Sequence, residues 1–173
     1  MKSILRATYS TLRNKSLKQK GQGMVEFALT FPILLMLILG IMEFGRLMFT
    51  YTSVITAARE AARYGAAAGT IEGGGAFYYQ DCNGIRDKAV AIGSIAAIDR
   101  VTGIDIQYDN GPGLDNIAAT CLPDGTGPNL DLGDRIEVTV TAQFQPAQGL
   151  IPIPPLTIRS TVRRTIVTNV EVR

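Results

Sequence analysis

Histidine is absent from this chain of 173 residues, and only two cysteines are present. Without histidine there is no Ser-His or Cys-His pair to activate a nucleophile, and histidine-based metal sites are excluded. A phosphate-binding glycine loop is also missing, because the glycines at 111, 113, 125 and 127 lack the required lysine and the strand-to-helix context. Hydrolysis by carboxylates alone remains a formal option. The sequence therefore predicts a protein that is not an enzyme and holds no cofactor or metal.

Acidic residues are absent from the first twenty positions, whereas cations are frequent there: Lys2, Arg6, Arg13, Lys15, Lys18 and Lys20. A basic cluster can bind nucleic acid, but one that precedes an apolar segment is typical of a membrane-topology signal. We therefore expect no nucleic-acid partner and a basic, mostly disordered leader. Because positive flanks stay in the cytoplasm, the rest of the chain is predicted to be exported.

A long apolar stretch runs from Gly21 to Tyr51 and carries no charge between Phe27 and Met42. As a helix, the uncharged part alone would be about 24 Å long, and its apolar flanks bring it to membrane thickness. We expect a membrane helix over 22–51, with no ordinary signal-peptide cleavage site directly after it. Glu43 and Arg46, three residues apart, share a face and are predicted to form an ion pair near the interface or to contact another subunit.

Glu26 is the unusual residue of this stretch, because a carboxylate inside a membrane helix costs up to about 2.5–3.5 kcal/mol. Such a group needs a partner. One possibility is that it lies at the cytoplasmic interface beside Lys20. The other is that a cation is created close to it.

The residues around Glu26 resemble a known processing site. Lys20-Gly21 followed by QGMVEF is similar to the junction in type IV pilin-like precursors, where a basic leader ends in glycine and a helix follows with glutamate at its fifth position. The closer resemblance, over about residues 20–69, is to the TadE-like family of tight-adherence pilus assembly proteins; it rests on GQGMVEFALTFPILLMLILGIMEFGRLMFTY and AAREAARYGA. It implies that a prepilin peptidase removes residues 1–21, so that Gln22 becomes the amino terminus and its new α-amino group pairs with Glu26.

The resemblance also implies a function and partners. The chain would be a pilin-like subunit, a pseudopilin or minor pilin, of a type IVc pilus involved in cell adhesion. Its partners would be the prepilin peptidase, other pilin-like subunits, the pilus assembly platform and the membrane. It would sit in the cytoplasmic membrane with its amino terminus inside and its carboxy-terminal domain outside, and could enter an extracellular pilus. The alternative is a signal-anchored extracytoplasmic binding domain that never polymerises.

The helical pattern continues over 52–69 with one face of small residues, and Gly69 is a plausible stop. This face is formed by Val54, Ala57, Ala58, Ala61, Ala62 and Gly65. Small side chains allow close approach, so the face is expected to pack either on the chain's own domain or between subunits.

Residues 70–173 are predicted to form a small exported α+β domain, in which one further helix packs on a roughly three-stranded antiparallel sheet. A glycine-rich loop with the partly buried aromatics Phe77, Tyr78 and Tyr79 comes first. Apolar spacing predicts the helix over Ile85–Val101. The strands are predicted at Ile104–Tyr108, Arg135–Gln145 and Leu156–Val170, the last two joined through Pro146–Pro155.

The segment Asp109–Asp134 is predicted to be a long loop that carries Cys121. Its aspartates raise the question of calcium, but the alternating oxygen ligands around a central glycine are absent, and Asp and Gly are also ordinary turn residues. An exported location permits a disulfide between Cys82 and Cys121, which would tie the loop to the second helix; a cytoplasmic location would leave two free thiols.

Overall fold

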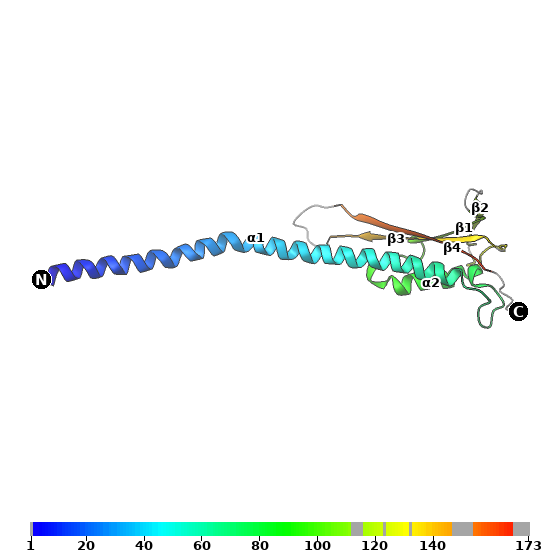
Figure 1. Ribbon diagram of the computed structural model, residues 1–173, viewed down its shortest axis with the longest axis horizontal. Helices are drawn as coiled ribbons and strands as arrows, with labels where there is room; N and C mark the ends of the chain where they lie inside the picture. The colour runs from blue at the N-terminus through cyan, green and yellow to red at the C-terminus, as the bar shows by residue number, and fades with distance from the viewer. Residues whose placement is uncertain (1, 112–115, 123, 132, 147–153, 168–173) are drawn as a thin grey trace. The chain divides into compact units, whose positions relative to one another are not determined.

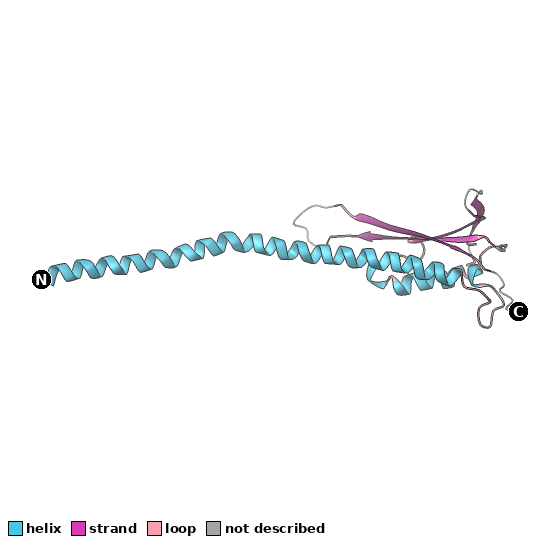
Figure 2. Ribbon diagram, in the orientation of Figure 1, coloured by secondary structure: helices cyan, strands magenta, loops and turns pink. Residues whose placement is uncertain are grey.

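The structure is a computed structural model that describes residues 2–111, 116–122, 124–131, 133–146 and 154–167. Side chains are described from Gly21 onward in these ranges, except at 116–119. The chain forms two compact units, residues 1–45 and 46–173, and each is described by itself. The elements are labelled in Figure 1 and coloured by type in Figure 2.

The first unit is helical and belongs to α1 (Lys2–Gly65), which continues into the second unit. The basic leader is part of this helix, so the expectation of a mostly disordered leader was wrong. Residues 2–20 contain neither glycine nor proline, so no helix-breaking residue interrupts α1 there. The helix also passes through Pro32, whose missing N–H removes one backbone hydrogen bond.

The second unit contains the end of α1 followed by short helices and a sheet. The helical elements are η1 (Tyr78–Gln80), α2 (Cys82–Ile92) and η2 (Ser94–Ala96). The strands are β1 (Ile104–Asp109), β2 (Asn116–Thr120), β3 (Arg135–Phe144) and β4 (Leu156–Thr165), and the sheet order is β2-β1-β3-β4. All neighbouring strands are antiparallel, which confirms the α+β class and the antiparallel sheet.

Three of the strands are those predicted from residue alternation. In β3, Ile136, Val138 and Val140 are fully buried on one face, while the polar residues between them lie on the other. β4 ends at Thr165, earlier than predicted, because its partner β3 begins at Arg135 and the pairing Arg135↔Thr165 is the last available. Positions 168–170 of the predicted strand lie outside the described residues.

The strand β2 was not predicted, because it lies within the glycine- and aspartate-rich segment 109–134 interpreted as a loop. It pairs with β1 through Tyr108↔Ile117 and Asp109↔Asn116, with an irregularity in register between Gln107 and Tyr108. The short run Asn116–Thr120 is too brief to show an alternation, so its pairing depends on the neighbouring edge of β1.

The predicted helix Ile85–Val101 is shorter in the structure and begins earlier. Asp81 caps α2 by accepting a hydrogen bond from the Gly84 N–H at 2.8 Å, and the helix ends at the cap residue Gly93. At Gly93 the side chain of Ile98 folds back so closely that a Cβ would clash with it. Ala96 and Ile98 are thereby buried, whereas Ile92 and Ile95 are exposed.

The core of the second unit lies between the inner face of the sheet and the helices. The small-residue face of α1 is buried there, with Val54, Ala57, Ala58, Ala61 and Ala62 all at 0% exposure. Of the two expected uses of this face, packing on the chain's own domain is the one observed. α1 ends at Gly65, and Gly69, the predicted stop, takes the left-handed conformation in the turn that follows.

Candidate functional site

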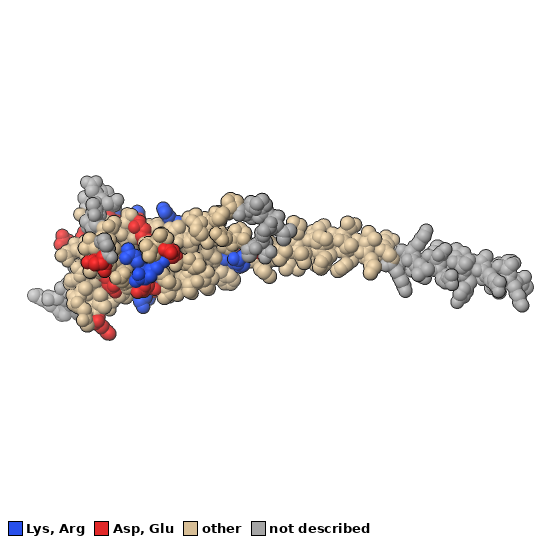
Figure 3. All heavy atoms as spheres, turned by 180° about the vertical axis from the view of Figure 1, so that it is seen from behind, with Lys and Arg blue, Asp and Glu red and all other residues tan. Residues whose placement is uncertain are grey.

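The apolar stretch of α1 presents its side chains outward. Large hydrophobic residues from Met24 to Tyr51 are exposed, including Phe27 at 64% and Ile41 at 72%. Among the described residues, Gly21–Gly65 is the one helix long and apolar enough to cross a membrane. Such a continuous exposed apolar surface is unfavourable in water and fits a lipid environment. In the view of Figure 3, charged side chains gather on the globular unit, and the part of α1 next to the grey residues is almost free of them.

Threonine hydroxyls along this helix bond to its own backbone. Thr30 donates to the carbonyl of Glu26 at 2.9 Å, Thr50 to that of Arg46 at 3.0 Å and Thr52 to that of Met48 at 3.0 Å. Because each hydroxyl is satisfied within the helix, none of these three needs water or an outside partner. The hydroxyls of these threonines are thus compatible with lipid.

The predicted processing residues lie in the regular part of α1. Gly21, Gln22 and Glu26 are all exposed, and a Cβ at Gly21 or at Gly23 would meet nothing within 4 Å. Gln22 and Glu26 are four residues apart in a continuous helix, so they lie on one face about one turn apart. This spacing is compatible with the predicted pairing of Glu26 with an α-amino group at Gln22. Cleavage itself and the role of Glu26 remain predictions.

At the start of the second unit, Arg46 contacts the sheet. Its guanidinium lies over the ring of Phe144, the last residue of β3, at 5.5 Å from the ring centroid. This is a cation–π distance. The ion pair of Glu43 with Arg46 stays a prediction. Sequence reasoning did not identify Phe144 as a partner of Arg46, because no local pattern relates positions so far apart in the chain.

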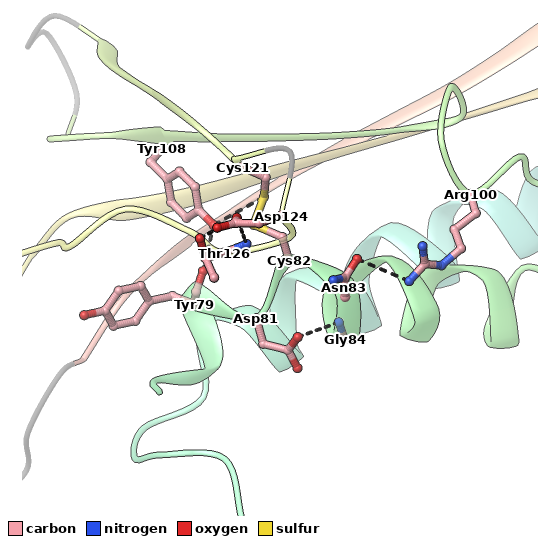
Figure 4. Close-up of a disulfide and its surroundings, with 10 residues drawn as sticks. All are labelled: Tyr79, Asp81, Cys82, Asn83, Gly84, Arg100, Tyr108, Cys121, Asp124 and Thr126. Atoms are coloured by element: carbon pink, nitrogen blue, oxygen red, sulfur yellow. Dashed lines mark hydrogen bonds between the residues drawn. A yellow bond between two sulfur atoms is a disulfide. The ribbon is translucent and has the colours of Figure 1, made fainter. Parts of the chain in front are cut away.

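A second candidate cluster surrounds the two cysteines, which form a disulfide (Figure 4). Cys82 is the first residue of α2 and Cys121 directly follows β2, so the bond ties the segment 109–134 to the second helix. The hydroxyl of Tyr108 lies 3.7 Å from the sulfur of Cys82 and 3.8 Å from that of Cys121, and donates to the Tyr79 carbonyl at 2.7 Å. Burial raises the pKa of Tyr108 well above its ordinary value, so the phenol stays a neutral donor.

Asp81 connects this cluster to α1. The hydroxyl of Tyr64 donates to its carboxylate at 2.8 Å, while the same carboxylate caps α2. Burial, and then the hydrogen bond to Asp81, raise the pKa of Tyr64 to about 12. The aromatics predicted to cover the domain do so: Tyr79 is buried, its ring stacks on Phe77, and Tyr78 packs edge-on against Tyr64. Asp is a preferred residue directly before a helix, so Asp81 in the sequence could have indicated the start of α2.

The aspartates of 109–134 are engaged in separate local contacts. Asp109 accepts from the Arg135 guanidinium at 2.6 Å, Asp124 bonds the Thr126 hydroxyl and N–H, and Asp134 accepts from the Asp131 N–H. The hydrogen bond from Arg135 is the main cause that lowers the pKa of Asp109. Within the part of the chain that the structure describes, no group of three acidic or cysteine residues is placed to hold a metal ion. Asp115 lies outside the described residues.

One comparison with known proteins gives a match. The family model described as TadE-like protein matches residues 21–63, about a quarter of the chain, and this match lies within the segment of about 20–69 on which the resemblance rested. No curated protein and no solved structure is similar enough to the chain to count as a match. The matched family is a pilus-associated structural family rather than one known for enzymes. The match and the exposed apolar helix fit a membrane protein associated with the tight-adherence pilus. Over residues 21–63, which hold the apolar helix and its exit into the globular unit, this chain is similar to TadE-like proteins.

Proposed function

We propose that this protein is a pilin-like subunit, a pseudopilin or minor pilin, of a tight-adherence type IVc pilus. It is anchored in the cytoplasmic membrane by α1 from Gln22 to about Tyr51, with the globular unit outside the cytoplasm. The observation that carries the proposal is the continuous exposed apolar surface of α1, which coincides with the TadE-like match and with the GQGMVE sequence. A membrane anchor that also serves as a packing helix is what a polymerising subunit needs.

The role of Glu26 follows from charge balance. A prepilin peptidase that cuts after Gly21 creates an α-amino group on Gln22, one turn from Glu26. The cation offsets the cost of the carboxylate in lipid, either within one subunit or between neighbours. Glu26 is exposed on α1 and therefore available to either partner.

The helical state of the processing site adds a requirement. Gly21 and Gln22 lie within α1, whereas a peptidase engages extended backbone, so the helix must open locally at the cut. Gly21 and Gly23 flank Gln22, and each glycine weakens a helix by about 1 kcal/mol relative to alanine. The two glycines thus lower the free energy needed to unwind the helix around the peptide bond that is cut.

The amino terminus of the mature protein tests the proposal. Full-length protein is expressed with and without a matching prepilin peptidase, extracted from membranes, and analysed by intact mass and amino-terminal sequencing. We expect Gln22 as the terminus only when the peptidase is present. Gly21→Val should abolish the cut, whereas Gly40→Val, in the same helix with open space around its Cβ, should leave it unchanged.

The opposite result identifies the alternative. If the leader persists in the presence of an active peptidase that cuts a control precursor, the protein is a signal-anchored extracytoplasmic domain. If the leader is removed instead, immunogold labelling of sheared filaments, compared with the membrane fraction, separates a filament component from an assembly factor.

A further inference from the structure

The first turns of the second unit have two different faces. On one face Leu47 packs against the core and Thr50 is buried. On the other, Met48, Phe49 and Tyr51 are 40%, 66% and 47% exposed. The apolar exposed surface of α1 therefore continues beyond Arg46, along turns whose opposite face already belongs to the globular unit.

One end of the sheet reaches the level of these turns. Phe144 lies under the guanidinium of Arg46, and its pairing partner across the sheet is Leu156, which is 50% exposed. Tyr51 lies five residues further along α1 than Arg46, a rise of about 7.5 Å. The end of the sheet, at Phe144 and Leu156, therefore lies nearer the start of α1 than Tyr51 does.

We propose that this end of the globular unit, formed by Phe144 and Leu156 with Arg46 and Arg159, is a lipid-binding surface that lies in the headgroup region of the membrane. The inference rests on the membrane anchoring of the proposed function. Tyrosine is enriched at the boundary between lipid and water. With Tyr51 at that boundary, Phe144 and Leu156 lie about 7 Å deeper, within the 5–10 Å over which interfacial elements bury apolar side chains.

The charges at this end match a lipid surface. Arg46 lies beside Phe144, and the exposed Arg159 follows Leu156 by three residues on β4, so both guanidinium groups can reach lipid phosphates. The sequence between Phe144 and Leu156 contains no charged residue. At the opposite end of the sheet lie Asp134 and the Asp109–Arg135 pair. That end carries charges of both signs, because Asp109 and Glu137 are paired with Arg135 and Arg163. The charged groups of the proposed surface, Arg46 and Arg159, are both cations, which lipid phosphates attract.

Tryptophan fluorescence offers a direct test, because the chain contains no tryptophan. Three single reporters are made in the full-length protein: Leu156→Trp at the proposed surface, Val167→Trp two residues after the opposite end of β4, and Leu37→Trp in the middle of the apolar stretch. Leu156 and Val167 are both partly exposed, at 50% and 38%, so neither replacement disturbs the core. Each variant is reconstituted into vesicles of phosphatidylcholine and phosphatidylglycerol, with either plain or brominated acyl chains.

We expect bromine to quench Leu37→Trp strongly and Leu156→Trp roughly twofold, since a residue buried about 5–10 Å into the headgroup region approaches the acyl chains. Val167→Trp should be unaffected. Adding Arg159→Glu to Leu156→Trp should reduce the quenching, and more so as the phosphatidylglycerol content rises. Combining Arg159→Glu with Val167→Trp should leave the fluorescence of that reporter unchanged.

Two outcomes overturn the inference and are distinguishable. If Leu37→Trp is quenched but Leu156→Trp behaves like Val167→Trp, the helix spans the membrane and the sheet end does not touch it; a second copy that covers Leu156 would give this result. If Leu37→Trp is not quenched either, the membrane anchoring of the proposed function fails together with the inference.

Discussion

Gly65, the last residue of α1, lies directly against Ile136 of β3. A Cβ on Gly65 would be 2.5 Å from Ile136 Cδ1 and 3.0 Å from Ile85 Cδ1, and both isoleucines are fully buried. The end of α1, α2 and the sheet therefore meet at one point that has room only for a hydrogen atom. A side chain at position 65 would push the terminal methyl groups of both isoleucines into their closely packed surroundings.

Gly65→Val is expected to destabilise the globular unit by about 1–3 kcal/mol, because the added methyl groups overpack this contact. The measurement is thermal unfolding of the full-length protein in detergent, followed by near-ultraviolet circular dichroism. Gly74→Val is the matched control, since a Cβ there meets nothing within 4 Å and the backbone is not left-handed. Equal melting temperatures for the two variants would contradict the packing described here.

Removal of the disulfide is expected to cost about 2–4 kcal/mol, because the bond closes a long loop in the unfolded chain. Cys82 and Cys121 are separated by 39 residues. The double replacement Cys82→Ala with Cys121→Ala removes both thiols, and the buried hydroxyl of Tyr108 keeps its hydrogen bond to the Tyr79 carbonyl. Reductant should lower the melting temperature of the natural protein and leave that of the variant unchanged. If the melting temperature of the natural protein stays the same after its disulfide has been fully reduced, the prediction is wrong.

The Asp109–Arg135 pair predicts a loss of stability in acid. The Arg135 hydrogen bond lowers the pKa of Asp109 in the folded state, so the contribution is complete above the pKa of the unfolded chain, near 4. It disappears as pH falls through the lower, folded pKa. Asp109→Asn should reduce stability at neutral pH and flatten its decline in acid.

Asp105→Asn is the control for this pair, because Asp105 lies exposed on the same strand and bonds the exposed Gln107 side chain. Unfolding is followed by urea titration between neutral pH and mild acid. If the free energy of unfolding falls equally in acid for Asp109→Asn and for the natural protein, the Asp109–Arg135 pair does not cause the loss of stability.

Glu26→Ala is expected to leave membrane insertion intact or improve it, because a carboxylate is removed from the apolar stretch. Pilus assembly should fall, since the α-amino group of Gln22 loses its partner. Glu26→Asp keeps the charge one methylene shorter and should retain part of the assembly. Counting pili on cells and the protein in membrane fractions separates the two effects; normal piliation in Glu26→Ala would remove the role given to this carboxylate.

Local sequence patterns identified the elements that have the same environment along their whole length, such as one buried face or a position in lipid. The alternation in β3 places Ile136, Val138 and Val140 on one face because every second residue of a strand points the same way. The uncharged run from Phe27 to Met42 indicates a membrane helix for the equally local reason that lipid excludes charge. Glycine and glutamate at Gly21 and Glu26 form a short motif, and the family match covers it.

Other features depend on residues that are far apart in the chain. The sequence permits a helix through Gly93, but Ile98 folds back against it and ends α2 there. The segment Asn116–Thr120 becomes β2 because β1 offers it an unpaired edge.

By itself, the amino-acid sequence determined the apolar helix, its basic leader, the three main strands and the pair of cysteines, because charge, hydrophobicity and period act over a few neighbouring residues. Only the tertiary structure decided that the small-residue face of α1 is covered by its own sheet, and that Arg46 lies over Phe144. A residue pattern records which surfaces must be buried, whereas the partner that buries them is selected by the packing of the whole unit.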